Sequence, residues 1–443
     1  MENKNHDHQL HIFFFPFMAQ GHIIPTTEMA KLFASRGCKS TIITTAYHAN
    51  LLSKTIQNSS QMINVLTFKF PSSENELPEG CESLHMAASP DLVQKFCKAT
   101  TMLGPQLDLL LKRHRPDCLV ADMLFTWSSD VAGRYGIPRL IFHGTCYFSL
   151  CASLCVHRYA PHKNVSSDSD PFLLPNLPGD FEFTRNQLAY YERNHEETEV
   201  GKVYNASKEI EGRSYGVLVN SFYELEPVYA DHYRKVLGVK ARHIGPLFLH
   251  NKLLAEDNAN KGIKMEHECL KWLNSKKPSS VVYVCFGSLS DFNDAQLMEI
   301  ALGLEASEQE FIWVVKKEKK QGIREKWLPE GVCAGVPMVT WPVSAEQFYN
   351  EKLVTKILGI GFGVGAQKWT RLVGDFVKRE AIEKALSRVM LGEEAEEMRS
   401  KAKALKEMAR RAVMEGGSSY LELDSFIEEL EVHRMARVDD SSS

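Results

Sequence analysis

His22 and Asp122 are the first residues whose types and positions could do chemistry. His22 follows the apolar run 10–17 and precedes a helical pattern, and Asp122 ends the apolar run 118–122. Ligands of open parallel sheets bind at the carboxyl ends of the strands, where both residues would lie. A histidine kept neutral near a helix N-terminus is a competent base, and an aspartate can orient it and stabilise its imidazolium. The alternatives are a histidine in a surface turn and an aspartate that caps the next helix.

Three further candidates lie in the second half of the chain. The loop CFGSLS at 285–290 follows an apolar run, and its Ser288 hydroxyl could contact a phosphate beside a closely approaching backbone. Glu346 and Gln347 follow the apolar segment 335–342 and could bind hydroxyl groups through a carboxylate and an amide. A tight turn between a strand and a helix, or a helix N-terminus, explains these three residues equally well.

Motifs of several other enzyme classes are missing from the sequence. It contains no HExxH, P-loop, GxSxG or GxGxxG pattern. The glycine-rich segment 361–365 follows a helical pattern and lacks the preceding strand of a dinucleotide fingerprint, so we interpret it as a turn and a strand. A nicotinamide-dependent dehydrogenase is therefore disfavoured.

Strand and helix patterns alternate along the chain, which predicts α/β domains with parallel sheets. The pattern predicts strands at 10–17, 39–45, 118–122, 138–143, 215–221, 281–286, 310–315 and 335–342, and helices at 25–37, 94–113, 126–135, 294–307 and 378–434. Polar residues near 250–262 indicate a linker. We expect an N-terminal domain at 1–248, a linker at 249–265, a C-terminal domain at 266–428 and a tail at 429–443.

Composition excludes several partners and compartments. The chain has 443 residues with 52 Lys and Arg against 56 Asp and Glu, a net charge of −4, which gives no electrostatic case for nucleic acid. Its apolar runs are shorter than the ~20 residues that span a bilayer, and the N-terminus has no secretory pattern. The ten cysteines form no CxxC pair. Free cysteines in apolar runs are typical of a reducing compartment, so we expect a cytoplasmic protein.

Four longer segments resemble the plant family 1 UDP-dependent glycosyltransferases. These segments are FFFPFMAQGHIIPTTEMAKLFASRG, LVADMLFTWSSDVAGRYGIPRLIFHG, SVVYVCFGSLS and GVCAGVPMVTWPVSAEQFYNEKLV. The resemblance covers nearly the whole chain. It implies the GT-B architecture, in which two Rossmann-like domains face each other across a cleft and the last helix crosses back to the first domain.

The resemblance also implies roles for individual residues. His22 resembles the general base that deprotonates the acceptor hydroxyl, and Asp122 resembles its partner. Ser288 resembles a residue that contacts the donor phosphates. Glu346 and Gln347 resemble the pair that binds the sugar hydroxyls, in which a final Gln is usual for glucose donors.

Two more residues complete the implied acceptor site, and no cofactor is implied. Thr145 and Ala345 are expected to contact the acceptor. The implied single displacement inverts the anomeric centre and needs no metal. The expected partners are UDP-glucose and a small-molecule acceptor, and we expect a monomer.

The donor-binding signature box departs from the family pattern. Counting back from Gln347, Glu330 and Gly331 fall where the ribose-binding glutamate and its following glycine belong. The opening tryptophan and glutamine that hold the uracil, and the HCGWNS-type segment that holds the diphosphate, have no counterpart. The junction near 327–332 resembles an internal deletion of ~35–45 residues, about two strands with their helices. We therefore expect unpaired backbone groups and exposed apolar side chains in the C-terminal domain.

The resemblance predicts inverting transfer of a sugar, glucose in particular, from a UDP-sugar to a hydroxyl of a small apolar natural product. Triterpenoids, steroids and flavonoids are the expected acceptor classes. The alternative is a catalytically impaired or inactive form that retains at most acceptor binding. Binding of an acceptor without binding of UDP distinguishes the two.

Overall fold

The chain forms two compact units. The computed structural model describes residues 9–57, 63–193, 198–258, 268–287, 290–315 and 332–442. The first unit comprises Met1–His157, Asn194–Lys252 and Arg411–Ser443, and the second comprises Arg158–Arg193 and Leu253–Arg410.

The compact units differ from the predicted domains at three places. Helix α10 (Leu247–Asn258) occupies the start of the expected linker 249–265, whose remainder lies outside the described residues. Residues 158–193 group with the second unit, where the Tyr349 hydroxyl donates a hydrogen bond to Glu192. Residues from Arg411 onward group with the first unit, and the described part of the expected tail, 429–442, belongs to a helix of that unit.

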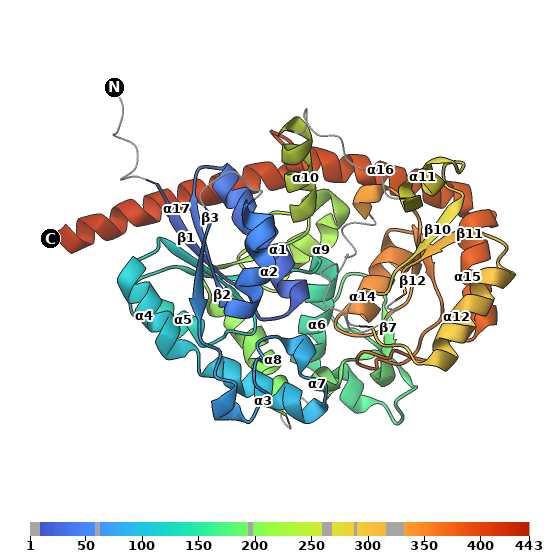
Figure 1. Ribbon diagram of the computed structural model, residues 1–443, viewed down its shortest axis with the longest axis horizontal. Helices are drawn as coiled ribbons and strands as arrows, with labels where there is room; N and C mark the ends of the chain where they lie inside the picture. The colour runs from blue at the N-terminus through green and yellow to red at the C-terminus, as the bar shows by residue number, and fades with distance from the viewer. Residues whose placement is uncertain are drawn as a thin grey trace. The chain divides into compact units, whose positions relative to one another are not determined.

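A seven-stranded sheet forms the centre of the first unit, and all its neighbouring strands are parallel (Figure 1). The strand order is β3-β2-β1-β4-β5-β8-β9. The strands are β1 (His11–Phe15), β2 (Lys39–Thr45), β3 (Ile63–Phe68), β4 (Cys118–Asp122), β5 (Arg139–His143), β8 (Gly216–Val219) and β9 (Ala241–His243). The strands predicted near 10–17, 39–45, 118–122, 138–143 and 215–221 are thus confirmed.

Helices cover both faces of this sheet, which explains why its strands read as continuous apolar runs. Phe13 and Phe15 of β1 pack into one buried cluster, and Ile12 and Phe14 pack into another on the opposite face. The first cluster is completed by α3 (Pro90–Thr101), α4 (Gly104–His114) and α5 (Ser128–Gly133). The second is completed by α1 (Gln20–Ser35), α2 (Ala46–Gln57), α10 and α17 (Ser418–Ser442). The first unit also contains the helices α6 (Tyr147–Tyr159), α8 (Glu199–Ile210) and α9 (Pro227–Asp231).

The last helix, α17, belongs to the core of the first unit. Its residues Leu423, Phe426 and Leu430 are buried in the second cluster. Polar contacts flank them, including an ion pair between Arg36, the C-cap of α1, and Asp424. The chain therefore completes its first unit with its last described helix.

Helix α1 begins earlier than predicted. We expected a helix from residue 25, with Pro25 in its first turn, but α1 starts at Gln20. The backbone N–H groups of His22 and Ile23 both donate to the carbonyl of Ala19, the N-cap residue. His22 therefore lies in the first turn of α1 instead of in the loop before it.

The second unit contains short strands in separate pairs. Strands β10 (Val281–Val284) and β11 (Glu310–Trp313) form one parallel pair, and β12 (Met338–Thr340) and β13 (Gly361–Gly363) form another. Strands β6 (Pro171–Leu173) and β7 (Glu182–Thr184) form an antiparallel pair. The helices are α7 (Tyr190–Arg193), α11 (Glu268–Asn274), α12 (Asp294–Ala306), α14 (Gln347–Lys352), α15 (Arg379–Leu391) and α16 (Ala395–Val413).

The two parallel pairs share one helical layer but do not join within the described residues. Val282 of β10 and Val339 of β12 both pack on a cluster that contains Leu304 of α12 and Leu386 of α15. In the described part of the chain, no hydrogen-bonded ladder connects β10 or β11 with β12 or β13.

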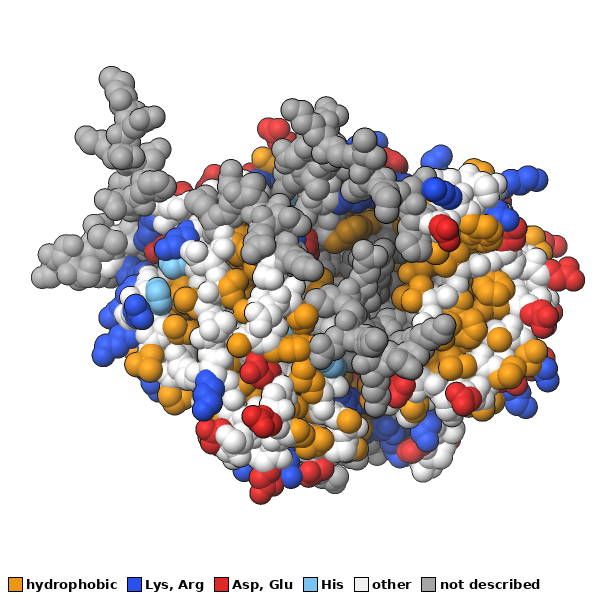
Figure 2. All heavy atoms as spheres, in the orientation of Figure 1, with side chains coloured by type: hydrophobic (Ala, Val, Ile, Leu, Met, Phe, Trp, Pro, Cys, Tyr) orange, Lys and Arg blue, Asp and Glu red, His pale blue; other side chains and the backbone are white. Residues whose placement is uncertain are grey.

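The parallel strands of the first unit are much more buried than those of the second unit. Every residue of β4, β5 and β8 is buried, whereas none of β10, β11 or β12 is. Tyr283 of β10 is 58% exposed and Phe311 of β11 is 40% exposed. Figure 2 shows hydrophobic side chains gathered on the surface of this part of the second unit.

Candidate active site

The topology of the first sheet places a ligand site between β1 and β4. From β1 the chain proceeds outward through β2 to β3, and from β4 it proceeds in the other direction through β5 and β8 to β9. The strand order reverses between the two central strands. In open parallel sheets, ligands bind beside the carboxyl ends of the strands at such a switch point. His22 follows β1 and Asp122 ends β4, so both lie at this point.

His22 and Asp122 form a close side-chain pair. His22 Nδ1 lies 2.6 Å from Asp122 Oδ2. The Asp122 side chain is 2% exposed, whereas that of His22 is 37% exposed. A buried aspartate that accepts from Nδ1–H fixes the tautomer in which Nε2 is the basic nitrogen. The pair can therefore take up a proton at Nε2 and stabilise the resulting imidazolium.

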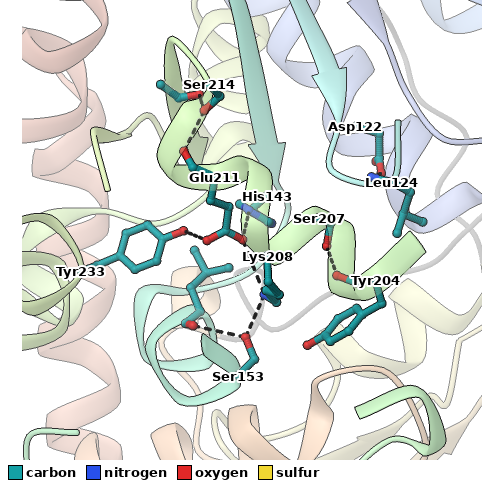
Figure 3. Close-up of polar contacts among 12 residues, drawn as sticks. Asp122, Leu124, His143, Ser153, Tyr204, Ser207, Lys208, Glu211, Ser214 and Tyr233 are labelled. Atoms are coloured by element: carbon teal, nitrogen blue, oxygen red, sulfur yellow. Dashed lines mark hydrogen bonds and ion pairs between the residues drawn. The ribbon is translucent and has the colours of Figure 1, made fainter. Parts of the chain in front are cut away.

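The local structure rules out the alternative role of Asp122 as a helix cap. Helix α5 begins at Ser128, six positions later, and its N-cap Trp127 makes no side-chain capping bond. Instead, Asp122 Oδ1 accepts a hydrogen bond of 3.0 Å from the backbone N–H of Leu124 (Figure 3). Burial alone would raise the pKa of Asp122, but His22 and this backbone bond lower it below its usual range. Asp122 is thus held as a carboxylate.

An aromatic side chain, that of Phe17, packs beside the histidine. The Phe17 ring centroid lies 5.5 Å from that of His22, and Phe17 also contacts Phe96 and Phe125. All three phenylalanines are buried. They limit the orientations of the imidazole ring and give its surroundings an apolar character.

Thr145 lies at the carboxyl end of β5, just before α6. Its hydroxyl oxygen is buried and has no hydrogen-bond partner among the described residues. A buried hydroxyl without a partner costs free energy unless a ligand or a water molecule pairs with it. Thr145 can therefore bind a polar group of a ligand.

A second buried polar cluster lies beyond the carboxyl end of β5, and sequence reasoning missed it. His143 Nε2 is 3.2 Å from Glu211 Oε1, and Lys208 Nζ is 3.6 Å from the same oxygen (Figure 3). The Tyr233 hydroxyl donates to Glu211 Oε2 at 2.7 Å, and Lys208 donates to the Ser153 hydroxyl at 2.9 Å. Burial opposes ionisation of Glu211, but the Lys208 charge and the His143 and Tyr233 hydrogen bonds lower its pKa to about 2. His143 ends a predicted strand, so the rule that ligands bind at the carboxyl ends of parallel strands could have found it. Lys208 and Glu211 do not follow a predicted strand, so that rule could not have found them.

The structure describes only part of the expected donor site. Ser288 and Glu330 lie outside the described residues. Glu346 is the N-cap of α14, and its Oε1 accepts from Asn350 Nδ2 at 3.3 Å. Gln347 Oε1 accepts from the backbone N–H groups of Val343 and Ser344 at 2.7 and 3.1 Å.

Ala345 forms the tip of the same turn. Its φ of 51° lies in the left-handed region, which is unfavourable for a residue with a Cβ atom. Trp369 Nε1 donates to its carbonyl oxygen at 3.1 Å, which holds the turn in this conformation. The side chain of Ala345 is exposed.

Comparison with known proteins decides the family. A search of protein-family models found no match. The chain is 52% identical to a UDP-glucose flavonoid 3-O-glucosyltransferase 7 of Fragaria ananassa, with 97% of this chain and 98% of that protein covered. It is 48% identical to the scopoletin glucosyltransferase of Nicotiana tabacum, with 96% and 98% covered. It belongs to the plant UDP-glycosyltransferases.

Solved structures agree with this assignment. Glycyrrhiza uralensis UGT73P12, crystallised with glycyrrhetinic acid 3-O-monoglucuronide, is 35% identical, with a TM-score of 0.87 and 98% of each chain covered. Medicago truncatula UGT71G1, crystallised with UDP-glucose, shares the fold at 23% identity and a TM-score of 0.72. The family and the GT-B fold class inferred from the sequence are confirmed.

This glycosyltransferase brings together only some of the residues that its sequence predicts. His22 and Asp122 meet, and Thr145 lies at the carboxyl edge of the same sheet. Glu346 and Gln347 lie together at the start of α14 in the second unit, as its N-cap and its first residue. None of the helices described for this enzyme is both long and apolar enough to cross a bilayer.

Proposed function

We propose that the chain transfers glucose from UDP-glucose to a hydroxyl of a small apolar natural product, with inversion at the anomeric carbon. The observation that carries the proposal is the 2.6 Å contact between His22 Nδ1 and Asp122 Oδ2. His22 Nε2 takes the hydroxyl proton while the acceptor oxygen bonds to the anomeric carbon. The bond from that carbon to the phosphate oxygen breaks, and UDP leaves with its electron pair. Asp122 stabilises the imidazolium formed.

The proposed acceptor is a triterpenoid, a steroid or a flavonoid. One relative is named for a flavonoid and one for scopoletin, and one solved neighbour was crystallised with glycyrrhetinic acid 3-O-monoglucuronide, which together support a small, largely apolar acceptor. Phe17 makes the surroundings of His22 suitable for an apolar ring system. The Thr145 hydroxyl can pair with a second polar group of the acceptor, and Ala345 is proposed as a further contact.

The proposed donor contacts are Ser288, Glu330, Glu346 and Gln347. Ser288 and Glu330 are assigned from the sequence alone. Since the Gln347 side-chain oxygen is already engaged by two backbone N–H groups, its NH₂ group is the part proposed to donate to a sugar hydroxyl. The proposed displacement uses no metal and no cofactor, and hydrogen-bond donors of the protein stabilise the leaving diphosphate.

A second candidate function is acceptor binding without sugar transfer. Two observations favour it. The described parallel strands of the second unit form two separate pairs with half-exposed residues. The alignment with the Fragaria ananassa enzyme extends over 484 positions, whereas the chain has 443 residues, so at least 41 aligned positions have no residue here. The first observation concerns the proposed donor-binding half, and the second supports a chain shortened relative to that enzyme.

We further propose that the chain acts in the cytoplasm as a monomer. None of the ten cysteines takes part in a disulfide bond and eight of them are buried, which suits a reducing compartment. The monomeric state is a prediction that sedimentation velocity tests directly.

Thermal unfolding with and without UDP-glucose tests the proposed function. A ligand that binds only the native state at about 100 times its Kd stabilises it by about 2.7 kcal/mol, so the midpoint must rise. Full sugar transfer predicts such a rise, a smaller rise for Gln347→Ala, and a glucosylated product with a flavonoid aglycone.

The two candidates give different outcomes in this experiment. No rise with UDP-glucose, together with saturable quenching of protein fluorescence by the aglycone, would support acceptor binding without transfer. No response to either ligand in a chain that unfolds cooperatively would contradict both.

A further inference from the structure

Arg139 carries a buried positive charge beside the His22–Asp122 pair. The residue is 4% exposed, although arginine is among the residues least often buried. It forms no ion pair with any described carboxylate, and its Nη1 has no hydrogen-bond partner among the described residues. Burying a charge that forms no ion pair costs folding free energy, so we expect Arg139 to have a role that offsets this cost.

The side chain of Arg139 connects two ends of neighbouring strands. Arg139 starts β5 and lies opposite Leu119 in the register with β4. Its guanidinium reaches the turn after the carboxyl end of β4, where Nη2 donates to the carbonyl oxygen of Asp122 at 2.9 Å. Nη2 also approaches the carbonyl of Phe125 at 3.4 Å, and Nε donates to the Ser128 hydroxyl at 3.1 Å.

These contacts fix the turn that carries the catalytic carboxylate. The Ser128 hydroxyl accepts from Arg139 and donates in turn to the Phe125 carbonyl at 2.6 Å. Within the same turn, Asp122 Oδ1 accepts from Leu124 N–H, which leaves Oδ2 for His22. Arg139 therefore holds the backbone on which the orientation of the Asp122 carboxylate depends.

The charge of Arg139 also acts on the protonation of the pair. Burial lowers the pKa of Arg139 to about 10 and the Asp122 charge opposes this, so the guanidinium stays protonated at neutral pH. A fixed cation favours the Asp122 carboxylate and disfavours a proton on His22. His143 at the end of β5 also acts on the Asp122 carboxylate, and His143 is itself paired with Glu211. The positive N-terminus of α1 acts in the same direction as Arg139.

We propose that Arg139 is a positioning residue of the catalytic pair, which orients Asp122 through the turn 122–128 and keeps His22 neutral at physiological pH. The inference rests on the proposed role of His22 as the general base. This role explains why a charged residue is buried here, since an apolar residue of similar size could fill the same space without loss of stability.

Titration of His22 by NMR tests the inference without requiring sugar transfer. The His22 signals of isotope-labelled protein are identified by their loss in His22→Gln. In Arg139→Gln the pKa of His22 is expected to rise by about one pH unit, the size typical for loss of a nearby charge. Arg139→Lys, which keeps the charge, is expected to leave it within about 0.3 of the wild-type value. Arg134→Gln removes an exposed arginine that pairs with Asp108 and serves as the matched control.

The outcomes separate the inference from the proposed function. An unchanged His22 pKa in Arg139→Gln, or an equal rise in Arg139→Lys and Arg139→Gln, would overturn the inference even if the enzyme turned over. A rise in Arg139→Gln alone would support it even if transfer were never observed. Arg139→Met, of similar length, replaces Arg139→Gln if the latter does not fold. If neither neutral variant folds while Arg139→Lys does, the positive charge is needed for folding itself and the inference is wrong.

Discussion

His22 and Asp122 are 100 positions apart in the sequence, and their side chains meet at 2.6 Å at the point where the strand order of the first sheet reverses. Their unequal exposure follows from this position. Asp122 ends a central strand and is covered on both faces, whereas His22 lies in the first turn of α1 with its ring partly open to solvent. The Asp122 carboxylate is therefore buried in the protein, whereas the His22 ring, whose Nε2 accepts the proton, is partly exposed to solvent.

Replacing Asp122 by asparagine should lower the proton affinity of His22. The substitution keeps the shape of the side chain but removes the charge that stabilises the imidazolium, so the His22 pKa should fall. Where transfer is measurable, the rate should drop by about 10²–10⁴, the usual contribution of a positioned acid–base group. Asp130→Asn, on the exposed face of α5, is the matched control. An unchanged His22 pKa, read by NMR, would contradict the assigned pairing.

Glu211 should make the first unit sensitive to acid. Its pKa is lowered from 4.5 to about 2 in the folded chain, so its contribution is present above about pH 4.5. That contribution is lost as the pH falls from about 4.5 through 2, and amounts to about 3 kcal/mol at most. Urea unfolding at pH 7 and pH 3 measures it.

Two variants separate the charge of Glu211 from its packing. Glu211→Gln leaves Lys208 buried without its carboxylate and should cost about 3–5 kcal/mol at pH 7. Combining it with Lys208→Met should recover part of that loss. Equal stability of the single and double variants would show that the two charges are not coupled.

Helix α17 should be required for the stability of the first unit. Leu423 is fully buried in the cluster that contains Phe14 of β1, and Leu423→Ala should destabilise the fold by about 2–5 kcal/mol. Leu421, two positions earlier on the same helix, is 54% exposed, and Leu421→Ala should change stability by less than about 0.5 kcal/mol. Chemical denaturation followed by circular dichroism compares the two. A similar loss for both would place α17 outside the core.

Backbone amides of the second unit should exchange with solvent faster than those of the first. Each of β10 and β12 has a ladder with only one described strand, whereas β1 and β4 are paired on both sides. Strands that are half-exposed and hydrogen-bonded on one side only need less free energy for the local unfolding that lets their amides exchange. Hydrogen exchange measured by mass spectrometry should protect β1 and β4 for longer than β10 and β12. Equal protection would mean that β10 and β12 are as fully hydrogen-bonded as the strands of the first sheet.

The sequence by itself located five of the seven strands of the first sheet and singled out His22 and Asp122 as candidate residues. Runs such as 118–122 are apolar at every position because helices cover both faces of the sheet, so their strands could be located directly. Candidates after such strands followed from the carboxyl-edge rule, which needs only chain order. The start of α1 was misplaced because Pro25 resembles a first-turn residue, while the backbone of Ala19 begins the helix five positions earlier.

Only the tertiary structure decided which of these groups act together. Arg139 and Lys208 look like ordinary surface charges in the sequence, because burial depends on which strands and helices become neighbours. The contacts of Glu211 with His143 and Tyr233 join segments far apart in the chain, and no local pattern encodes them. From the missing part of the donor-binding signature box, the sequence predicted unpaired strands in the C-terminal domain. The separation of β10 from β12 depends on hydrogen bonding between strands, which is a property of the folded sheet.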